Sequence, residues 1–169
     1  MTNRSNVKAK LCWKSSPVGD LAIVTSKDRL ELVTFRHLWE GFKSKFPGVE
    51  VGSDPYSIIV CNQLDEYFAG ERMMFDLDLN MKGTCFQNQV WNSLVKIPYG
   101  KVITYKEQAC LIDNPKAVRA VGRANGLNPF CIVLPCHRVV GSNGELTGYA
   151  GGIKHKKFLL EMEALGAIV

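Results

Sequence analysis

Residues 132–141, IVLPCHRVVG, place a thiol, an imidazole and a guanidinium side by side within an apolar run. A deprotonated cysteine is the strongest nucleophile among side chains, and His137 is a residue type that accepts such a proton. Adjacent strand residues point to opposite faces, so contact between Cys136 and His137 requires a bend, which Pro135 favours. The segment would allow a nucleophilic cysteine activated by histidine. For a Cys-His pair taken alone, however, a buried structural cysteine beside an exposed histidine is the favoured interpretation.

A histidine that acts as a base needs a third group to orient its ring. Three carboxylates lie nearby in the sequence: Glu145, Glu161 and Glu163. The sequence alone does not choose among them.

The composition is ordinary for a folded protein, with 169 residues of which 46% are hydrophobic and 22% charged. No stretch approaches the ~18 apolar residues of a membrane span, and no apolar segment follows the basic N-terminus as in a signal peptide. We expect a cytoplasmic protein, nucleoid-associated or, in a eukaryote, nuclear. Cys12, His37 and Cys61 are too few and too scattered for a zinc site, and the cysteines lack C-x-x-C spacing. We therefore expect no metal.

Positive charge gathers where two short helices are predicted. Thr104 caps the first helix, with Glu107 three residues later, and Pro115 stands in the first turn of the second. Six basic residues oppose two acidic ones between positions 96 and 123: Lys96, Lys101, Lys106, Lys116, Arg119 and Arg123. The second helix is slim, and Arg119 and Arg123 lie one turn apart. This helix-turn-helix pattern suits a phosphate backbone or a narrow groove. The alternative is helix packing through the same small residues, with the arginines in solvent.

The remaining elements are predicted from apolar periodicity and turn residues. An antiparallel three-strand meander is expected from residues 9–16, 19–26 and 30–37. Helices are expected at 38–47, 54–70, 85–97 and 154–165, and a brief strand at 74–80. The last helix is expected to bury Phe158, Leu159, Met162 and Leu165, while His155 is expected in solvent.

Three segments over roughly residues 84–165 carry a family resemblance: NPKAVRAVGRANGLNP, PCHRVV and GYAGG…KKFLLEMEA. They resemble the O6-alkylguanine-DNA alkyltransferases (methylated-DNA–protein-cysteine methyltransferases). The N-terminal block is similar only in layout and in SSPVGDL. The resemblance implies an α/β (α+β) fold of two domains. The first, residues 1–82, would hold a three-stranded antiparallel sheet with helices in a ribonuclease H-like layout. The second, residues 83–169, would be a winged-helix-like helix-turn-helix domain carrying the acceptor cysteine.

The resemblance also implies a reaction and roles for single residues. An alkyl group would move irreversibly from O6 of guanine, or O4 of thymine, to Cys136 after the nucleotide has flipped out of the DNA. His137 matches the residue that deprotonates the cysteine through a water, and Glu163 the carboxylate that orients it. Asn128 matches the side chain that braces the active-site turn, and Tyr105 the phenol that hydrogen-bonds the base. No cofactor is implied, and each molecule would act once.

The resemblance assigns the DNA and base contacts as well. Arg119 matches the arginine that enters the base stack in place of the flipped nucleotide. The other DNA-contact positions are Thr104, Lys116, Ala120, Gly122 and Arg123. The base pocket would be lined by Pro135, Val139, Tyr149, Ala150 and Gly151. The implied partner is double-stranded DNA containing O6-alkylguanine, bound through its minor groove by a monomer.

Two other functions compete with alkyl transfer. A DNA-damage sensor of the same fold would bind the lesion without repairing it, but such relatives replace the cysteine that Cys136 retains here. A cysteine hydrolase would use Cys136, His137 and Glu163 for turnover on esters or peptides without DNA.

Overall fold

A mixed four-stranded sheet, in the order β3-β2-β1-β4, forms the N-terminal half. The computed structural model describes residues 8–166, so residues 1–7 of the basic N-terminus lie outside the described part. The predicted meander is confirmed: β1 (Lys10–Lys14) and β3 (Arg29–Phe35) both pair antiparallel with β2 (Leu21–Ser26). The prediction missed β4 (Glu50–Val51), which adds to β1 in parallel. Two residues are too few to show an alternating pattern.

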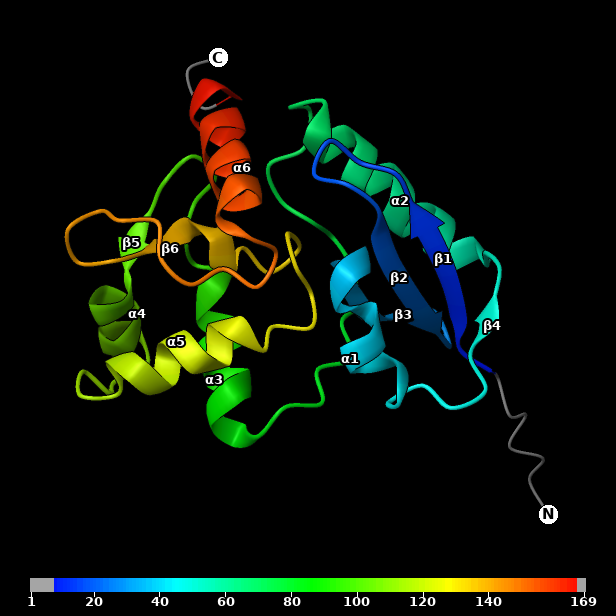
Figure 1. Cartoon of the computed structure of the whole chain (residues 1–169), viewed down its shortest axis with the longest axis horizontal. Coiled ribbons are helices and arrows are strands. Elements are labelled where there is room, and N and C mark those ends of the chain that lie inside the picture. Colours follow the sequence, from blue (N-terminus) through cyan, green and yellow to red (C-terminus); the bar gives the residue numbers. More distant parts are fainter. Residues whose placement is uncertain (1–7, 167–169) are drawn as a thin grey trace.

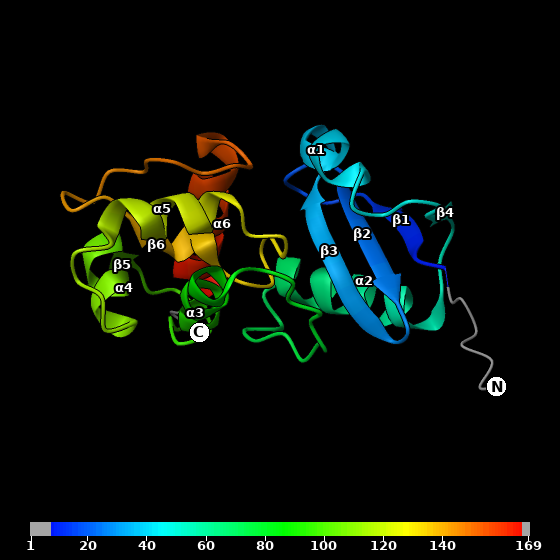
Figure 2. The ribbon, with the colours of Figure 1, turned by 90° about the horizontal axis from the view of Figure 1, so that it is seen from below.

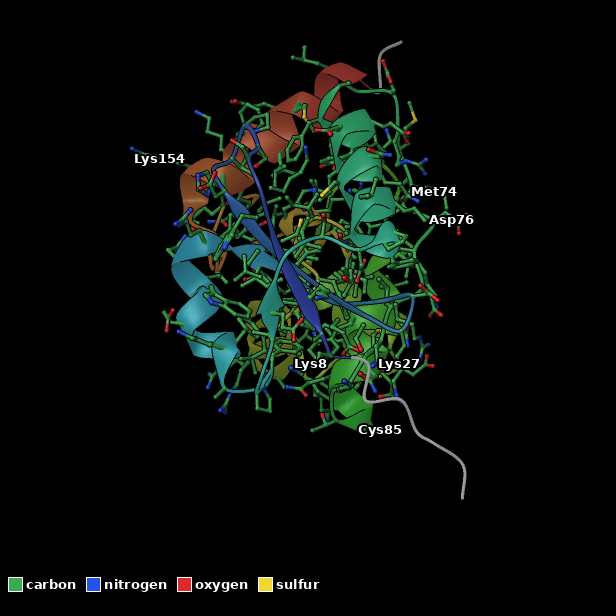
Figure 3. The ribbon with its side chains drawn as sticks, turned by 90° about the vertical axis from the view of Figure 1, so that its right-hand side faces the viewer. Lys8, Lys27, Met74, Asp76, Cys85 and Lys154 are labelled. Atoms are coloured by element: carbon green, nitrogen blue, oxygen red, sulfur yellow. The ribbon has the colours of Figure 1, made fainter. Side chains whose placement is uncertain are left out.

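Helices cover both faces of this sheet. On one face, α1 (Trp39–Lys43) follows a 3-10 turn, η1 (Arg36–Leu38), and packs Trp39 on Leu11, Val24 and Leu32. The helix is shorter than the one predicted over 38–47. On the other face lies α2 (Pro55–Phe68), and Figure 3 shows the two helices on either side of the strands. The prediction of α2 is confirmed, with Asp54 as its N-cap.

The strand predicted over residues 74–80 does not form. Only Leu79 bridges Leu30 of β3. Upstream, the Gln63 side chain on α2 donates to the Asp76 carbonyl at 2.8 Å and accepts from its N–H at 2.9 Å. In a sheet, a neighbouring strand would have bonded these two backbone groups. Here the Gln63 side chain takes the place of those inter-strand hydrogen bonds.

The C-terminal half is helical, as Figure 1 shows. Four helices build it: α3 (Cys85–Leu94), α4 (Tyr105–Leu111), α5 (Val118–Gly126) and α6 (Ile153–Gly166). A short parallel pair joins β5 (Ile103–Thr104) to β6 (Val139–Val140). Thr84 and Thr104 cap α3 and α4 as predicted. Pro115 lies in the turn before α5 and not in its first turn, since α5 begins at Val118.

The prediction for the buried face of α6 was right for Leu159 and for Met162, which packs against the core, but wrong for Phe158 and Leu165. Phe158 and Leu165 are 39% and 71% exposed, whereas Lys156, Leu159 and Glu163 are completely buried. Lys156 and Glu163 can lie in the interior because hydrogen-bond partners are available to them there. The periodicity of apolar residues in the sequence carries no information about such partners.

One hydrophobic core runs through both halves of the molecule. At the boundary, Val33 of β3 donates its N–H to the Pro129 carbonyl and accepts from Cys131 N–H, each at 2.9 Å. Figure 2 shows β3 as the strand nearest the helical half. The chain that leads to Cys136 is therefore anchored on the sheet. Within residues 8–166, no helix is long and apolar enough to cross a membrane.

Candidate active site

The predicted bend at Pro135 is present, and every residue from 131 to 140 is buried. A 3-10 turn, η2 (Cys136–Arg138), follows Pro135 and leads into β6. Asn128 holds this turn: its Nδ2 donates to the Leu134 carbonyl at 2.8 Å and to Cys136 Sγ at 3.2 Å. Upstream, Ile132 has a φ of 74°, which β-branched residues rarely adopt. The backbone before the cysteine is thus strained and held by its surroundings.

The Cys136 thiol is only 6% exposed. Burial raises its pKa, against the hydrogen bond from Asn128 and the charge of Lys156, which both lower it. At neutral pH the sulfur is therefore protonated and needs a base to become a nucleophile.

His137, the next residue in the chain, carries a basic nitrogen. Its Nε2 lies 2.8 Å from Glu163 Oε1, and both side chains are completely buried. An ionised carboxylate only accepts hydrogen bonds, so we assign the ring proton to Nε2. Nδ1 is then a bare acceptor, and it has no hydrogen-bond partner among residues 8–166. Burial lowers the pKa of His137, which keeps the ring neutral near pH 7. Of the three candidate carboxylates, Glu145 and Glu161 are exposed and only Glu163 reaches the histidine.

Glu163 is the centre of a buried hydrogen-bond network. Arg138 donates two hydrogen bonds to this carboxylate, from Nε to Oε2 at 2.9 Å and from Nη2 to Oε1 at 3.0 Å. Tyr67, from α2 of the other half, donates its hydroxyl to Oε1 at 2.6 Å. Burial raises the pKa of Glu163, but the bonds from His137 and Arg138 outweigh it and lower the pKa to about 2. The carboxylate stays ionised and orients His137 without itself taking a proton.

Arg138 also bonds the backbone. Its Nη1 donates to the Ile97 carbonyl at 2.7 Å, while its main partner is the carboxylate. Tyr67 was not anticipated, because a tyrosine on the apolar face of a helix is typical of core.

Sequence reasoning also missed Lys156, a completely buried lysine. Its Nζ donates to the Val139 carbonyl at 2.6 Å and to the Thr147 carbonyl at 3.1 Å, joining β6 to the loop that follows. Burial lowers its pKa. Lys156 and Glu163 are seven residues apart and share one helical face, the signal that could have found them.

The loop after β6 brings Tyr105 and Tyr149 into the same region. Tyr105 donates to the Thr147 carbonyl at 3.0 Å, and burial together with the charge of Cys136 raises its pKa, so the phenol keeps its proton. The Tyr149 hydroxyl is buried and has no hydrogen-bond partner among the described residues. Gly151 is required by close packing, since a Cβ there would lie 2.2 Å from the Phe35 ring.

The other predicted pocket residues are spread between interior and surface. Pro135 and Val139, which flank the turn η2, are buried, while Ala150 is exposed. His155, expected in solvent, is half-buried and stacks on Phe35 with ring centroids 5.2 Å apart.

The predicted DNA-contact residues lie on α5 or near its start, except Thr104, which ends β5 and is half-buried. Lys116, Arg119, Ala120 and Arg123 are exposed. A Cβ at Gly122 would touch the Tyr105 ring at 3.8 Å, so the slim face of α5 lies against the pocket tyrosine. Within residues 8–166, the six basic side chains between positions 96 and 123 form no ion pairs, which leaves their charge available.

Comparison with known proteins finds the same arrangement over nearly the whole chain. Residues 85–165 match the family model of the 6-O-methylguanine DNA methyltransferase, DNA binding domain. A methylated-DNA–protein-cysteine methyltransferase of Methanosarcina acetivorans is 46% identical over 149 residues, which is 88% of this chain and 94% of the relative. The constitutive enzyme of Bacillus subtilis with that name is 44% identical over 152 residues, covering 89% and 92%.

Solved structures agree with these sequence matches. The Mycobacterium tuberculosis O6-methylguanine methyltransferase has a TM-score of 0.84 at 40% identity, with 93% of each chain covered. The same organism's OGT in complex with DNA has a TM-score of 0.85 at 39% identity, covering 93% of this chain and 94% of that one. The fold and the site thus define an α/β methyltransferase with a buried cysteine. The chain belongs to the methylated-DNA–protein-cysteine methyltransferase family.

Proposed function

We propose that this protein repairs alkylated DNA by moving a methyl or larger alkyl group from O6 of guanine, or O4 of thymine, onto Cys136. The observation that carries the proposal is a buried thiol followed in the chain by a neutral histidine, whose Nδ1 has no hydrogen-bond partner among residues 8–166 and whose Nε2 is bonded to Glu163. His137 accepts the thiol proton through a water. The S–C bond then forms as the bond from carbon to O6 breaks, and guanine departs as an anion that takes up a proton.

Tyr105 and Asn128 assist this step. The phenol of Tyr105 keeps its proton and can donate to the departing base, which stabilises the charge that develops there. Asn128 keeps the sulfur in place through its bond to Sγ. The product is a thioether, which has no easy route back to a thiol. Each molecule therefore acts once and needs no cofactor.

DNA would be bound through α5, in the minor groove of a duplex, by a single copy of the chain. The support is the basic outer side of this helix and, on another face, its contact with Tyr105 through Gly122. Arg119 enters the stack when the nucleotide flips, offsetting part of an unstacking cost of a few kcal/mol. The phosphate backbone of the DNA is bound by Lys116, Arg123 and Thr104, so the affinity for DNA falls as the salt concentration rises.

The finer architecture is part of the same proposal. Residues 1–82 form the ribonuclease H-like domain and residues 83–169 the winged-helix-like domain that holds the acceptor. The base pocket is lined by Pro135, Val139, Tyr149, Ala150 and Gly151, and the protein acts in the compartment that holds the DNA.

The reaction is tested with an oligonucleotide that carries labelled O6-methylguanine. Label should move to the protein at no more than one group per chain. Cys136→Ser should abolish the transfer, while Cys131→Ala, which removes another buried thiol five residues away, should keep it. Labelling that survives in the serine variant, or several groups per chain, contradicts the mechanism. Binding without transfer would favour a damage sensor, and ester turnover without DNA a cysteine hydrolase.

The role of Arg119 is tested by comparing two substrates. Arg119→Ala should weaken transfer from duplex DNA much more than transfer from free O6-benzylguanine, because only the duplex has a gap to fill. Arg123→Ala, one turn further along α5, is the matched control and should lower duplex binding without a specific loss in flipping. Equal losses on both substrates for Arg119→Ala argue against the stacking role.

A further inference from the structure

Two cysteines far apart in the sequence meet in the N-terminal half. Cys12 on β1 and Cys61 on α2 bring their Sγ atoms to 3.7 Å. The two residues are 49 positions apart in the sequence, so only the fold brings them together. His37 is not part of the cluster, since its ring lies against the Ala150 carbonyl. Among the described residues, no group of three possible metal ligands forms. The feature is therefore a pair of thiols.

The pair is placed for a covalent bond. A disulfide has an S–S distance of about 2.05 Å, so these sulfurs need to approach by only about 1.7 Å. Strand β1 and helix α2 already pack against each other, and Figure 3 shows them side by side. Both side chains are half-buried, so a small oxidant can reach them.

The pair is also chemically distinct from the acceptor cysteine. Cys61 can donate a hydrogen bond to a Cys12 thiolate, which lowers the pKa of Cys12, and Lys14 acts in the same direction against burial and Asp54. Burial raises the pKa of Cys136. Because the thiolate is the reactive form, thiol oxidants meet a readier nucleophile at Cys12 than at the alkyl acceptor.

We propose that Cys12 and Cys61 form a reversible disulfide that links β1 to α2, and that this pair reacts with low-molecular-weight disulfides before Cys136 does. With glutathione disulfide, the Cys12 thiolate attacks one sulfur and releases the first glutathione thiolate. Cys61 then attacks the Cys12 sulfur of the mixed disulfide and releases the second. The two cysteines lose two protons and two electrons, and one glutathione disulfide becomes two glutathione thiols. The bond spares the acceptor, so the oxidised protein keeps its capacity for alkyl transfer.

The test maps the thiols of the full chain after incubation with glutathione disulfide. After acid quenching, denaturation and alkylation with iodoacetamide, the Cys12 and Cys61 peptides should be recovered linked, two hydrogens lighter than the separate thiols. This product should appear at least tenfold faster than any loss of free Cys136, and dithiothreitol should reverse it. The midpoint of thermal unfolding should rise by roughly 5 °C or more, since the bond closes a long loop.

Variants make the outcome unambiguous. Cys61→Ser should leave Cys12 as a mixed disulfide with glutathione, whereas Cys110→Ser, which removes an exposed thiol on α4, should leave the link unchanged. Recovery of Cys12 and Cys61 as free thiols while other cysteines carry glutathione overturns the proposal. So does oxidation of Cys136 first, or a link that forms only in denaturant. Transfer of labelled methyl to the oxidised protein is measured separately, so failure of the repair reaction and failure of the disulfide are distinguishable.

Discussion

Tyr67→Phe removes one hydroxyl from the buried network and keeps the ring in place. The hydroxyl donates to Glu163 Oε1 at 2.6 Å, and both side chains are completely buried. It comes from α2, so the variant tests whether the N-terminal half takes part in the chemistry of the C-terminal half. We expect Tyr67 to be a positioning residue that acts through Glu163 and His137.

The size of the effect follows from the contacts that remain. A hydrogen bond to a charged group stabilises a protein by about 1.5–3 kcal/mol, which for a chain of this size lowers the unfolding midpoint by roughly 3–12 °C. His137 and Arg138 still donate to Oε1, so the imidazole stays oriented. We therefore expect the rate of transfer to fall only about 3- to 10-fold, equivalent to at most about 1.4 kcal/mol.

The pH dependence separates positioning from mere loss of stability. Without the Tyr67 donor, the charge of Glu163 is less compensated, so the pKa of His137 should rise from its lowered value. The acid side of the profile of transfer rate against pH, measured with O6-benzylguanine below the unfolding temperature, should then move to higher pH. Tyr99→Phe is the matched control, because the Tyr99 hydroxyl has no hydrogen-bond partner among residues 8–166. An unchanged profile for Tyr67→Phe, or an equal shift in the control, refutes the reasoning.

Three further predictions test other parts of the protein. Asn128→Ala should slow transfer to O6-benzylguanine at least tenfold, because the acceptor turn loses its brace; a wild-type rate contradicts this. Gly151→Ala should lower the unfolding midpoint, since its Cβ would lie 2.2 Å from Phe35. Phe35→Leu should recover part of that loss, and Gly126→Ala, with open space around it, should cost nothing. The folded protein lowers the pKa of Glu163 from 4.5 to about 2, so the ionised carboxylate stabilises the folded state. This stabilisation is complete above about pH 4.5 and is lost as the pH falls toward about 2. Acid titration of the unfolding free energy should show this window, and Glu163→Gln should remove it.

Local signals predicted local structure well. Asp54, Thr84 and Thr104 each begin a helix where the sequence suggested, because a cap needs only the backbone N–H groups two or three residues later. The bend at Pro135 is of the same kind. Predictions failed where a distant segment decided the outcome: the edge strand β4, the segment 74–80 that Gln63 satisfies, and the buried face of α6.

The sequence by itself determined that Cys136 and His137 are neighbours next to a bend, and which helices flank them, because these features depend on residues adjacent in the chain. Residue spacing left three carboxylates open beside the histidine and only the family resemblance favoured Glu163, whose bond to His137 the tertiary structure shows. Only the tertiary structure decided that Tyr67 from the other half completes the network and that Lys156 lies inside. A charge can be buried only where partners replace its water, and those partners come from segments far apart in the sequence. The pattern of apolar residues and the spacing of motifs in the sequence do not show which distant segments come into contact.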